Sequence, residues 1–219
     1  VLEFCREAGV RIVEHVSTAY VCGLRTGVVR ESELDVGQQF ANDYEKSKVA
    51  AEELIRSDTN LEAYTIFRPT IIVGDYRTGY TSTFHGFYAP LRIGYALLTK
   101  IRFDQLFEVD YLSLLGLVGE ETKNLVPVDW VSDTILSILA RRPPRNETFM
   151  LASDRPVSTR RLVTVFGDVV RRRGWPEDVP WEPATPGNPR PASGELDAFK
   201  NAYVEQLGAY RSYWRDDPV

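Results

Sequence analysis

The sequence predicts an α/β fold in which helices wrap a parallel sheet. Strand and helix patterns alternate along most of the chain with short connections between them, and this order is typical of parallel sheets. The 219 residues are 43% hydrophobic and 26% charged, which is an ordinary globular composition that suits one large domain or two modest lobes.

The first half of the chain contains the clearest elements. Residues 1–9 read as the end of a helix closed by Gly9, and residues 10–18, VRIVEHVST, read as a mostly buried strand. After a loop, residues 42–55, NDYEKSKVAAEELI, predict an amphipathic helix. A second strand, EAYTIFRPT, follows at 62–70, and a glycine- and threonine-rich excursion begins at Ile71.

The second half continues the alternation. NLVPVDWVSDTILSILARRPP predicts a short strand that runs into a helix with Asp129 as its N-cap, and ETFMLAS predicts another strand. A helix then begins with an N-cap at Ser158 or Thr159 and stops at Gly174. A proline-rich linker separates it from a last, aromatic helix over residues 196–214.

Charge and composition exclude several classes of partner. The net charge of -5 and the pI near 5.2 argue against a general affinity for nucleic acid or anionic membranes. No apolar run approaches the roughly 20 residues that span a bilayer, and the first residues lack the layout of a signal peptide. Cys5 and Cys22 are too few for a zinc site or a disulfide framework, so we expect no metal and a reducing, cytoplasmic location.

Tyr44 and Lys48 stand four residues apart on the predicted helix, so both side chains lie on one face. A nearby ammonium stabilises a phenolate, and such a pair can pass a proton to a carbonyl oxygen. The spacing alone carries little weight, because pairs of this kind also arise by chance. The context adds weight, because the hydroxyls of Ser17 and Thr18 and the ring of Pro69 follow the two flanking strands, where parallel sheets bind ligands.

Four segments together resemble an extended short-chain dehydrogenase/reductase: VSTAYVCG, NDYEKSKVAAE, FRPTIIVGD and LVPVDWVSDTI. They are most similar to the thioester reductases and fatty acyl reductases, the male sterility branch of NAD-binding domains, and the tail YRSYWRDDP is also similar to that branch. The resemblance implies the C-terminal part of a Rossmann-like, doubly wound sheet over residues 1–75 and 120–152. Residues 76–119 and 153–219 would form a smaller, mostly helical substrate lobe.

The resemblance also implies a catalytic set and a reaction. Thr18 would stabilise the developing oxyanion, Tyr44 would donate the proton, and Lys48 would support Tyr44 and bind the nicotinamide ribose. The substrate would be a small-molecule or carrier-bound acyl thioester or aldehyde, reduced by NADP(H) or, alternatively, NAD(H).

By the same resemblance, further residues would border the cofactor and the substrate. The other residues that would border the cofactor are Ser17, Pro69, Thr70, Ile71 and Ile72. Those that would line an acyl pocket are Tyr20, Tyr80, Thr81, Phe84 and His85, although a lone histidine without an acid partner is more often a packing residue.

One departure from the family is central. The glycine turn G-x-x-G-x-x-G, which lets a backbone approach the dinucleotide diphosphate, is absent from the 219 residues. We therefore expect an N-terminal half, or a partner chain, to supply that turn. Two alternatives stay open: a nucleotide-sugar epimerase or dehydratase of the same fold, and a cofactor-free pseudoenzyme or interaction module.

Overall fold

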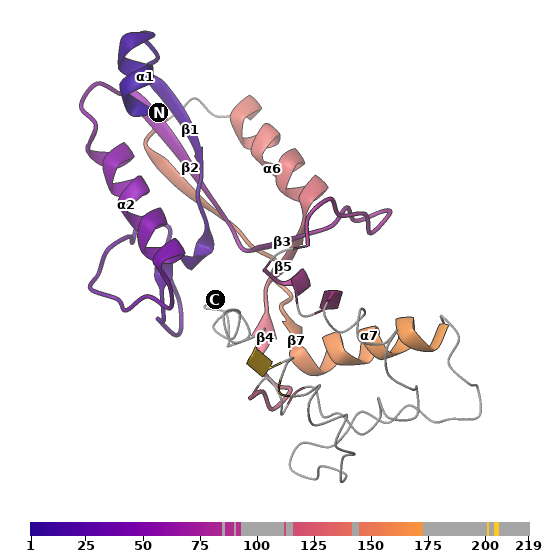
Figure 1. Cartoon of the computed structure of the whole chain (residues 1–219). Helices are drawn as coiled ribbons and strands as arrows, with labels where there is room; N and C mark the ends of the chain where they lie inside the picture. Colours follow the sequence, from indigo (N-terminus) through magenta and orange to yellow (C-terminus); the bar gives the residue numbers. More distant parts are fainter. Residues whose placement is uncertain are drawn as a thin grey trace. The chain divides into compact units, whose positions relative to one another are not determined.

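The chain forms two compact units in a computed structural model that describes residues 1–84, 86–89, 91–92, 112, 116–141, 145–172, 201 and 204–205 (Figure 1). The described residues of the first unit lie within Val1–Thr81 and Asn124–Arg155. Those of the second lie within Ser82–Lys123 and Pro156–Asp217. The assignment of a cofactor role and a substrate role to two lobes stays a prediction.

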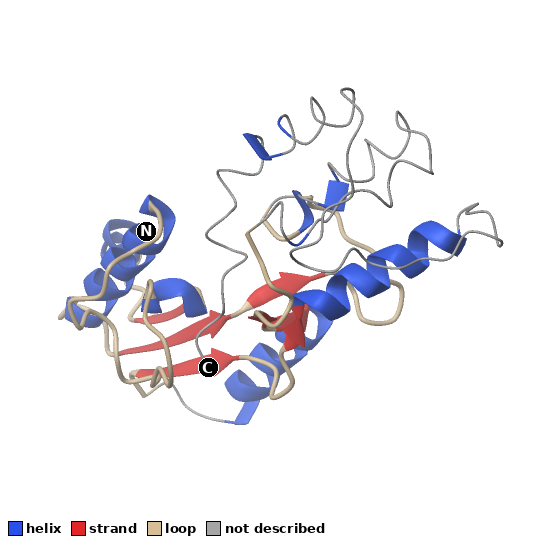
Figure 2. Cartoon of the chain, turned by 90° about the horizontal axis from the view of Figure 1, so that it is seen from below, coloured by secondary structure: helices blue, strands red, loops and turns tan. Residues whose placement is uncertain are grey.

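A parallel sheet organises the first unit. Strands β1 (Ile12–Val16), β2 (Ala63–Pro69) and β6 (Glu147–Leu151) run side by side in the order β1-β2-β6 (Figure 2). Both pairings are parallel, with Val16 beside Phe67 and Phe67 beside Phe149. The predicted α/β fold with a parallel sheet is confirmed.

A second, two-stranded parallel ladder follows β2 at once. Strand β3 (Ile71–Val73) pairs with β5 (Leu125–Pro127). The prediction of an irregular excursion from Ile71 was therefore wrong for its first residues, because a three-residue apolar run gives no local sign of a strand partner about 50 residues away. The glycine-rich stretch after β3 contains turns, as expected.

Two long helices lie on opposite faces of the three-stranded sheet. Helix α6 (Val128–Arg141) covers β2 and β6, where Phe67, Val126, Val131 and Leu151 form a buried cluster. Helix α2 (Asp43–Ser57) covers the other face, and Arg56 donates a 3.0 Å hydrogen bond to Thr148 Oγ1 on β6. The short helix α1 (Leu2–Glu7) precedes β1, and Gly9, with φ near +69°, ends it as predicted.

Strand β1 departs from the prediction of a mostly buried strand. Its residues alternate between exposed and half-buried, and Ile12 and Val16 are 47% and 49% exposed. The physical reason is the position of β1 at the edge of the described sheet, where α6 does not cover its apolar side chains. A β-branched composition predicts a strand but does not predict which elements cover it.

The second unit contains a short antiparallel ladder and a long helix. Strand β4 (Thr122–Lys123) pairs with β7 (Val157–Ser158), and α7 (Thr159–Arg172) follows directly. Ser158 Oγ accepts the backbone N–H of Arg161 at 3.2 Å, which confirms the predicted N-cap. Gly174, the proline-rich linker and most of the predicted last helix lie outside the described residues. Within the described part of the chain, no helix combines the length and the apolar character needed to span a bilayer.

Candidate functional site

The start of α2 is fixed by a capping box. Asn42 Oδ1 accepts the Glu45 backbone N–H at 3.0 Å, and Glu45 Oε2 accepts the Ala41 N–H at 2.8 Å. Burial raises the pKa of the Glu45 carboxyl, and the hydrogen bonds from Ala41 and Asn42 oppose that shift. This buried cap fixes the first turn of the helix, and Tyr44 is part of that turn.

Tyr44 and Lys48 lie on the same face of α2, as their spacing predicts. Lys48 Nζ stands 5.6 Å from the centroid of the Tyr44 ring, within the range of a cation–π contact. Tyr44 is 46% exposed, so its hydroxyl is accessible to a molecule that approaches from solvent. The structure thus brings the proposed proton donor and its cationic neighbour together.

Two hydroxyls mark the carboxyl end of β1. Thr18 is the N-cap of the 3-10 helix η1 (Ala19–Cys22), and its Oγ1 accepts the Tyr20 N–H at 3.2 Å. Because this bond uses an oxygen lone pair, the hydroxyl proton of Thr18 is left to donate. Ser17 is 5% exposed, and its Oγ has no hydrogen-bond partner within the part of the chain that the structure describes. An unpaired buried hydroxyl is costly, so Ser17 is well suited to bind a polar group that arrives at this strand end.

The loop between η1 and α2 is closed at its base. Leu24 donates its N–H to the Gln39 carbonyl at 2.8 Å, and Gln38 Nε2 donates to the Val21 carbonyl at 2.8 Å. Gly23, with φ near +62°, is required there because a Cβ would lie only 2.2 Å from the Gln39 oxygen. The closed loop leaves η1 in contact with α2.

A buried ion pair secures this loop to β2. Arg68 donates from Nη2 and Nε to the two carboxylate oxygens of Glu52, at 2.7 and 3.0 Å, and both side chains are fully buried. Its third nitrogen, Nη1, donates to the Glu33 carbonyl at 2.9 Å and to the Glu31 carbonyl at 3.4 Å. Arg68 therefore holds together β2, α2 and the loop that leads to Tyr44.

His15 lies under α2 beside Lys48. Burial and the charge of Lys48 lower the pKa of the His15 imidazole, while Glu52 acts in the opposite direction. Its Nε2 atom has no hydrogen-bond partner among the described residues. His15 therefore acts as a packing residue on the sheet face that α2 covers.

The predicted cofactor residues after β2 are held by an asparagine that sequence reasoning missed. Thr70 Oγ1 donates to Asn124 Oδ1 at 3.0 Å, and the Ile71 N–H donates to the Asn124 carbonyl at 3.1 Å. Asn124 also exchanges two 2.8 Å hydrogen bonds with the backbone of Ser153. Pro69 ends β2, whereas Ile71 and Ile72 lie on β3. No sequence signal marks Asn124, because its partners lie far from it along the chain.

The predicted acyl-pocket residues belong to different parts of the chain. Tyr20 is half-buried in η1, Tyr80 is exposed and Thr81 is half-buried, all within the first unit. Phe84 belongs to the second unit, where its ring meets the edge of Tyr88 at 6.2 Å between centroids. His85 lies outside the described residues. The acyl pocket and the catalytic roles of the other residues stay predictions.

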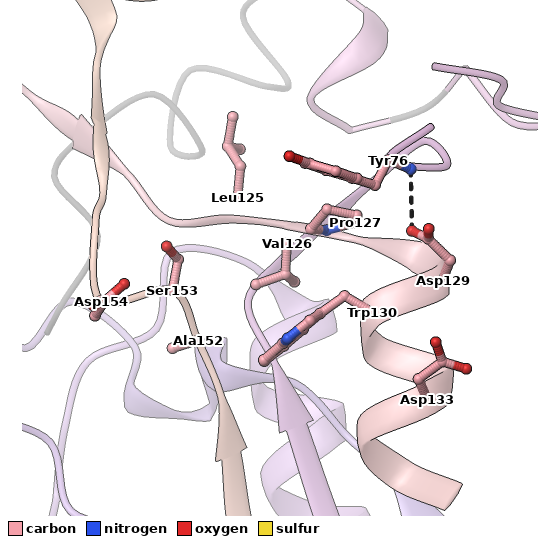
Figure 3. Close-up of a pocket in the computed structure, with 10 residues that line it drawn as sticks. All are labelled: Tyr76, Leu125, Val126, Pro127, Asp129, Trp130, Asp133, Ala152, Ser153 and Asp154. Carbon is pink, nitrogen blue, oxygen red and sulfur yellow. Dashed lines mark hydrogen bonds between the residues drawn. The ribbon is translucent and has the colours of Figure 1, made fainter. Parts of the chain in front are cut away.

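A pocket of about 650 Å³ lies elsewhere in the first unit, at the start of α6 (Figure 3). None of the predicted site residues lines it. Asp129 is in the first turn of α6 and accepts the Tyr76 N–H at 3.1 Å, so it secures the loop after β3. The residues that line the pocket are Tyr76, Leu125, Val126, Pro127, Asp129, Trp130, Asp133, Ala152, Ser153 and Asp154.

Comparisons with known proteins identify the family. Residues 1–135 match the family described as male sterility protein, an NAD-binding family, and the chain belongs to it. This confirms the predicted male sterility branch of NAD-binding domains. A search of the curated proteins found no match.

Solved structures agree with the fold. The terminal R domain of the myxalamid PKS-NRPS pathway is 21% identical, with a TM-score of 0.55, over 97% of this chain and 59% of that chain. MoeE5, solved with UDP-glucuronic acid and NAD, is 19% identical, with a TM-score of 0.52, over 97% and 67%. A UDP-glucuronic acid 4-epimerase from Bacillus cereus, solved with NAD, is 15% identical, with a TM-score of 0.50, over 95% and 65%. The chain spans about three fifths to two thirds of the length of these structures.

Proposed function

We propose that this member of the male sterility protein family carries the proton-donating half of a reductase that acts on an acyl thioester or an aldehyde. The observation that carries the proposal is the accessible Tyr44 with Lys48 Nζ 5.6 Å from its ring, on a helix in contact with the Thr18 cap. The family supports an NAD-binding enzyme, and we propose NADP(H) as the preferred cofactor over NAD(H).

The residues of this chain suit one end of such a cofactor. Ser17 offers an unpaired hydroxyl, and Tyr44 with Lys48 offers a phenol and an ammonium, which are groups that bind a ribose and an amide. The sequence contains no glycine-rich turn, so this chain offers no counterpart for the diphosphate end of the cofactor. A bound, reduced nicotinamide supplies the hydride for carbonyl reduction.

The protein groups then have distinct tasks. The Tyr44 O–H donates its proton to the carbonyl oxygen, and the Lys48 ammonium stabilises the phenolate left behind. The Thr18 O–H, held by its bond from the Tyr20 N–H, donates to the same oxygen as negative charge develops on it. Each group acts on the oxygen only if substrate enters beside α2.

Matched variants test these roles. The assay follows NADPH consumption with an acyl-coenzyme A and with the corresponding aldehyde, using this chain together with the polypeptide encoded upstream of Val1. Tyr44→Phe should lower kcat by about 10²–10⁴-fold, the usual range for a general acid. Tyr64→Phe is the control and should not lower kcat, because Tyr64 lies at the start of β2 and the candidate site lies at its carboxyl end. Lys48→Met should lower kcat, whereas Lys46→Met, an exposed neighbour on α2, should not. Unchanged turnover in Tyr44→Phe would refute the mechanism.

A second candidate of the same fold is a nucleotide-sugar epimerase or dehydratase. Its support is the structural likeness to MoeE5 and to the Bacillus cereus epimerase, which concerns the fold alone. Incubation of the same preparation with UDP-glucose or UDP-glucuronic acid separates the two candidates. Epimerised or dehydrated sugar without acyl reduction would favour the second. A folded preparation that neither binds NADPH nor transforms either substrate would favour the cofactor-free pseudoenzyme or interaction module.

A further inference from the structure

The pocket at the start of α6, called the α6 pocket below, has two aromatic side chains in its walls. Tyr76 and Trp130 both line it and are 80% and 41% exposed. In Figure 3 their rings point toward the segment Ala152–Asp154, which forms the opposite side of the pocket. Val126 and Pro127 add apolar surface. The cavity of about 650 Å³ has the size of a small-molecule site, for which about 300–1,000 Å³ is usual.

The charge of the α6 pocket is negative. Among the described residues that line it, the charged side chains are Asp129 and Asp133, four residues apart on α6, and Asp154 after β6. Arg77 and Arg155 are close along the chain, but no described lysine or arginine forms an ion pair with these three aspartates. Asp129 also offsets the positive end of the helix dipole, because it lies in the first turn of α6. The pocket therefore attracts a cation rather than an anion.

Hydrogen bonds fix both sides of the α6 pocket. Asp129 Oδ1 accepts the Tyr76 N–H at 3.1 Å, which holds the loop that carries the Tyr76 ring. On the opposite side, the Ser153 N–H donates to Asn124 Oδ1 and Asn124 Nδ2 donates to the Ser153 carbonyl, both at 2.8 Å. Walls that are already in place lose little conformational freedom when a ligand binds. The pocket is thus preformed for a small molecule.

Rings and carboxylates together recognise an organic cation. The face of an aromatic ring attracts an ammonium or guanidinium group, and a carboxylate accepts a charge-assisted hydrogen bond from either group. A metal ion suits the pocket less well, because the described residues contain no group of three or more His, Cys, Asp or Glu side chains that could hold one. The apolar surface suits a hydrocarbon body attached to the cationic group.

We propose that the α6 pocket binds a small organic cation, in which an ammonium or guanidinium group is attached to an apolar body. The cationic group contacts the rings of Tyr76 and Trp130, and the aspartates balance its charge. The site goes beyond the proposed function, because Tyr44 and Lys48 belong to α2, on the opposite face of the three-stranded sheet. Binding in the α6 pocket therefore does not require the reductase reaction.

The test uses the full chain and three probes of similar shape: the cation 4-phenylbutylamine, the neutral 4-phenylbutanol and the anion 4-phenylbutyrate. Isothermal titration calorimetry measures their affinities, and NMR follows the Trp130 indole N–H, which is assigned by its absence in Trp130→Leu. The amine should bind at least about tenfold more tightly than the alcohol, and the carboxylate should bind more weakly than both. Added salt should weaken binding of the amine but not of the alcohol.

Variants locate the contact. Tyr76→Leu removes an exposed ring and should weaken binding of the amine by about two- to fivefold. Asp133→Asn should weaken it by about the same factor without changing the affinity for the alcohol, and the double variant should lose about tenfold. Glu53→Gln is the control, because it removes an exposed carboxylate of α2 outside the pocket, and it should leave the affinity unchanged. Circular dichroism checks the fold of each variant.

Three results would overturn the proposal. Equal affinities for the amine and the alcohol would show that the pocket does not recognise charge. Equal weakening by Asp133→Asn and Glu53→Gln would show that the amine responds only to the net charge of the chain. Tighter binding of the capped peptide acetyl-Gly-Arg-Gly-amide than of the amine would assign the pocket to a protein partner. A chain that binds the amine but reduces no acyl substrate would refute only the proposed function.

Discussion

Strands β1 and β2 are neighbours in one parallel sheet, yet their surroundings differ sharply. Both are rich in β-branched or aromatic residues, and both are followed directly by hydroxyl residues of the candidate site, Ser17 after β1 and Thr70 after β2. Ile66 and Phe67 on β2 are fully buried, whereas Ile12 and Val16 on β1 are about half exposed. The comparison shows that side-chain type selects the strand, while neighbouring strands and helices decide its burial.

The two strands also differ in their roles, because β2 carries residues that stabilise the fold and β1 ends at residues proposed to bind a ligand. Strand β2 holds the buried Arg68 that secures the loop before α2, so it acts as the rigid centre of the first unit. Strand β1 offers an open edge and an unpaired Ser17 hydroxyl at its end. In the proposed function, a polar group of the ligand binds at the Ser17 hydroxyl, beside the rigid strand β2.

The largest expected effect comes from breaking the buried ion pair at β2. Arg68→Met should lower the free energy of unfolding by about 3–5 kcal/mol, because it leaves the buried Glu52 carboxylate with only its longer, 3.4 Å ion pair to Arg56. Arg11→Met, just before β1, removes an exposed pair with Glu62 and should cost less than about 1 kcal/mol. Urea unfolding measures both variants. Equal losses of stability in the two variants would contradict the contrast between the two strands. The double variant Arg68→Met with Glu52→Leu should recover part of the free energy of unfolding that Arg68→Met loses.

A pair of identical substitutions tests burial directly. Ile66→Ala on β2 should cost about 2–5 kcal/mol, since it leaves a cavity in a packed core. Ile12→Ala on β1 should cost less than about 1 kcal/mol in the chain alone, because Ile12 is 47% exposed. Thermal and urea unfolding provide the measurements. A large cost at Ile12 would mean that its face is already covered in solution.

A smaller effect concerns pH and the covered face of β1. Burial and Lys48 lower the pKa of His15 below its ordinary value of 6.5, so the folded state disfavours the imidazolium. Protons then bind more readily to the unfolded chain, and stability present above pH 6.5 is lost as the pH falls through the folded-state pKa. His15→Gln should flatten the stability profile below pH 6.5. An identical slope in both proteins would refute this role, and His85 is retained in both as a control.

Local sequence signals predicted several parts of this structure. The helix that begins near Asn42, the Tyr44–Lys48 spacing, strand β2 and the Ser158 cap all follow from neighbours within a few residues. What depends on distant partners was missed: the exposed face of β1, the pairing of β3 with β5, the role of Asn124 in holding Thr70, and the pocket at α6. These features arise from contacts between segments that no local pattern connects.

The central claim is that Tyr44 and Lys48 form a proton-donating site, and that the glycine-rich dinucleotide turn is not contained in these 219 residues. The most direct measurement is a fluorescence titration with NADPH, and with NADH in parallel, of the folded chain alone and then with the upstream polypeptide added. We expect no saturable binding by the chain alone and saturable binding in the micromolar range once the polypeptide is present. Micromolar binding by the chain alone would contradict the claim, because it would show a complete dinucleotide site within these 219 residues.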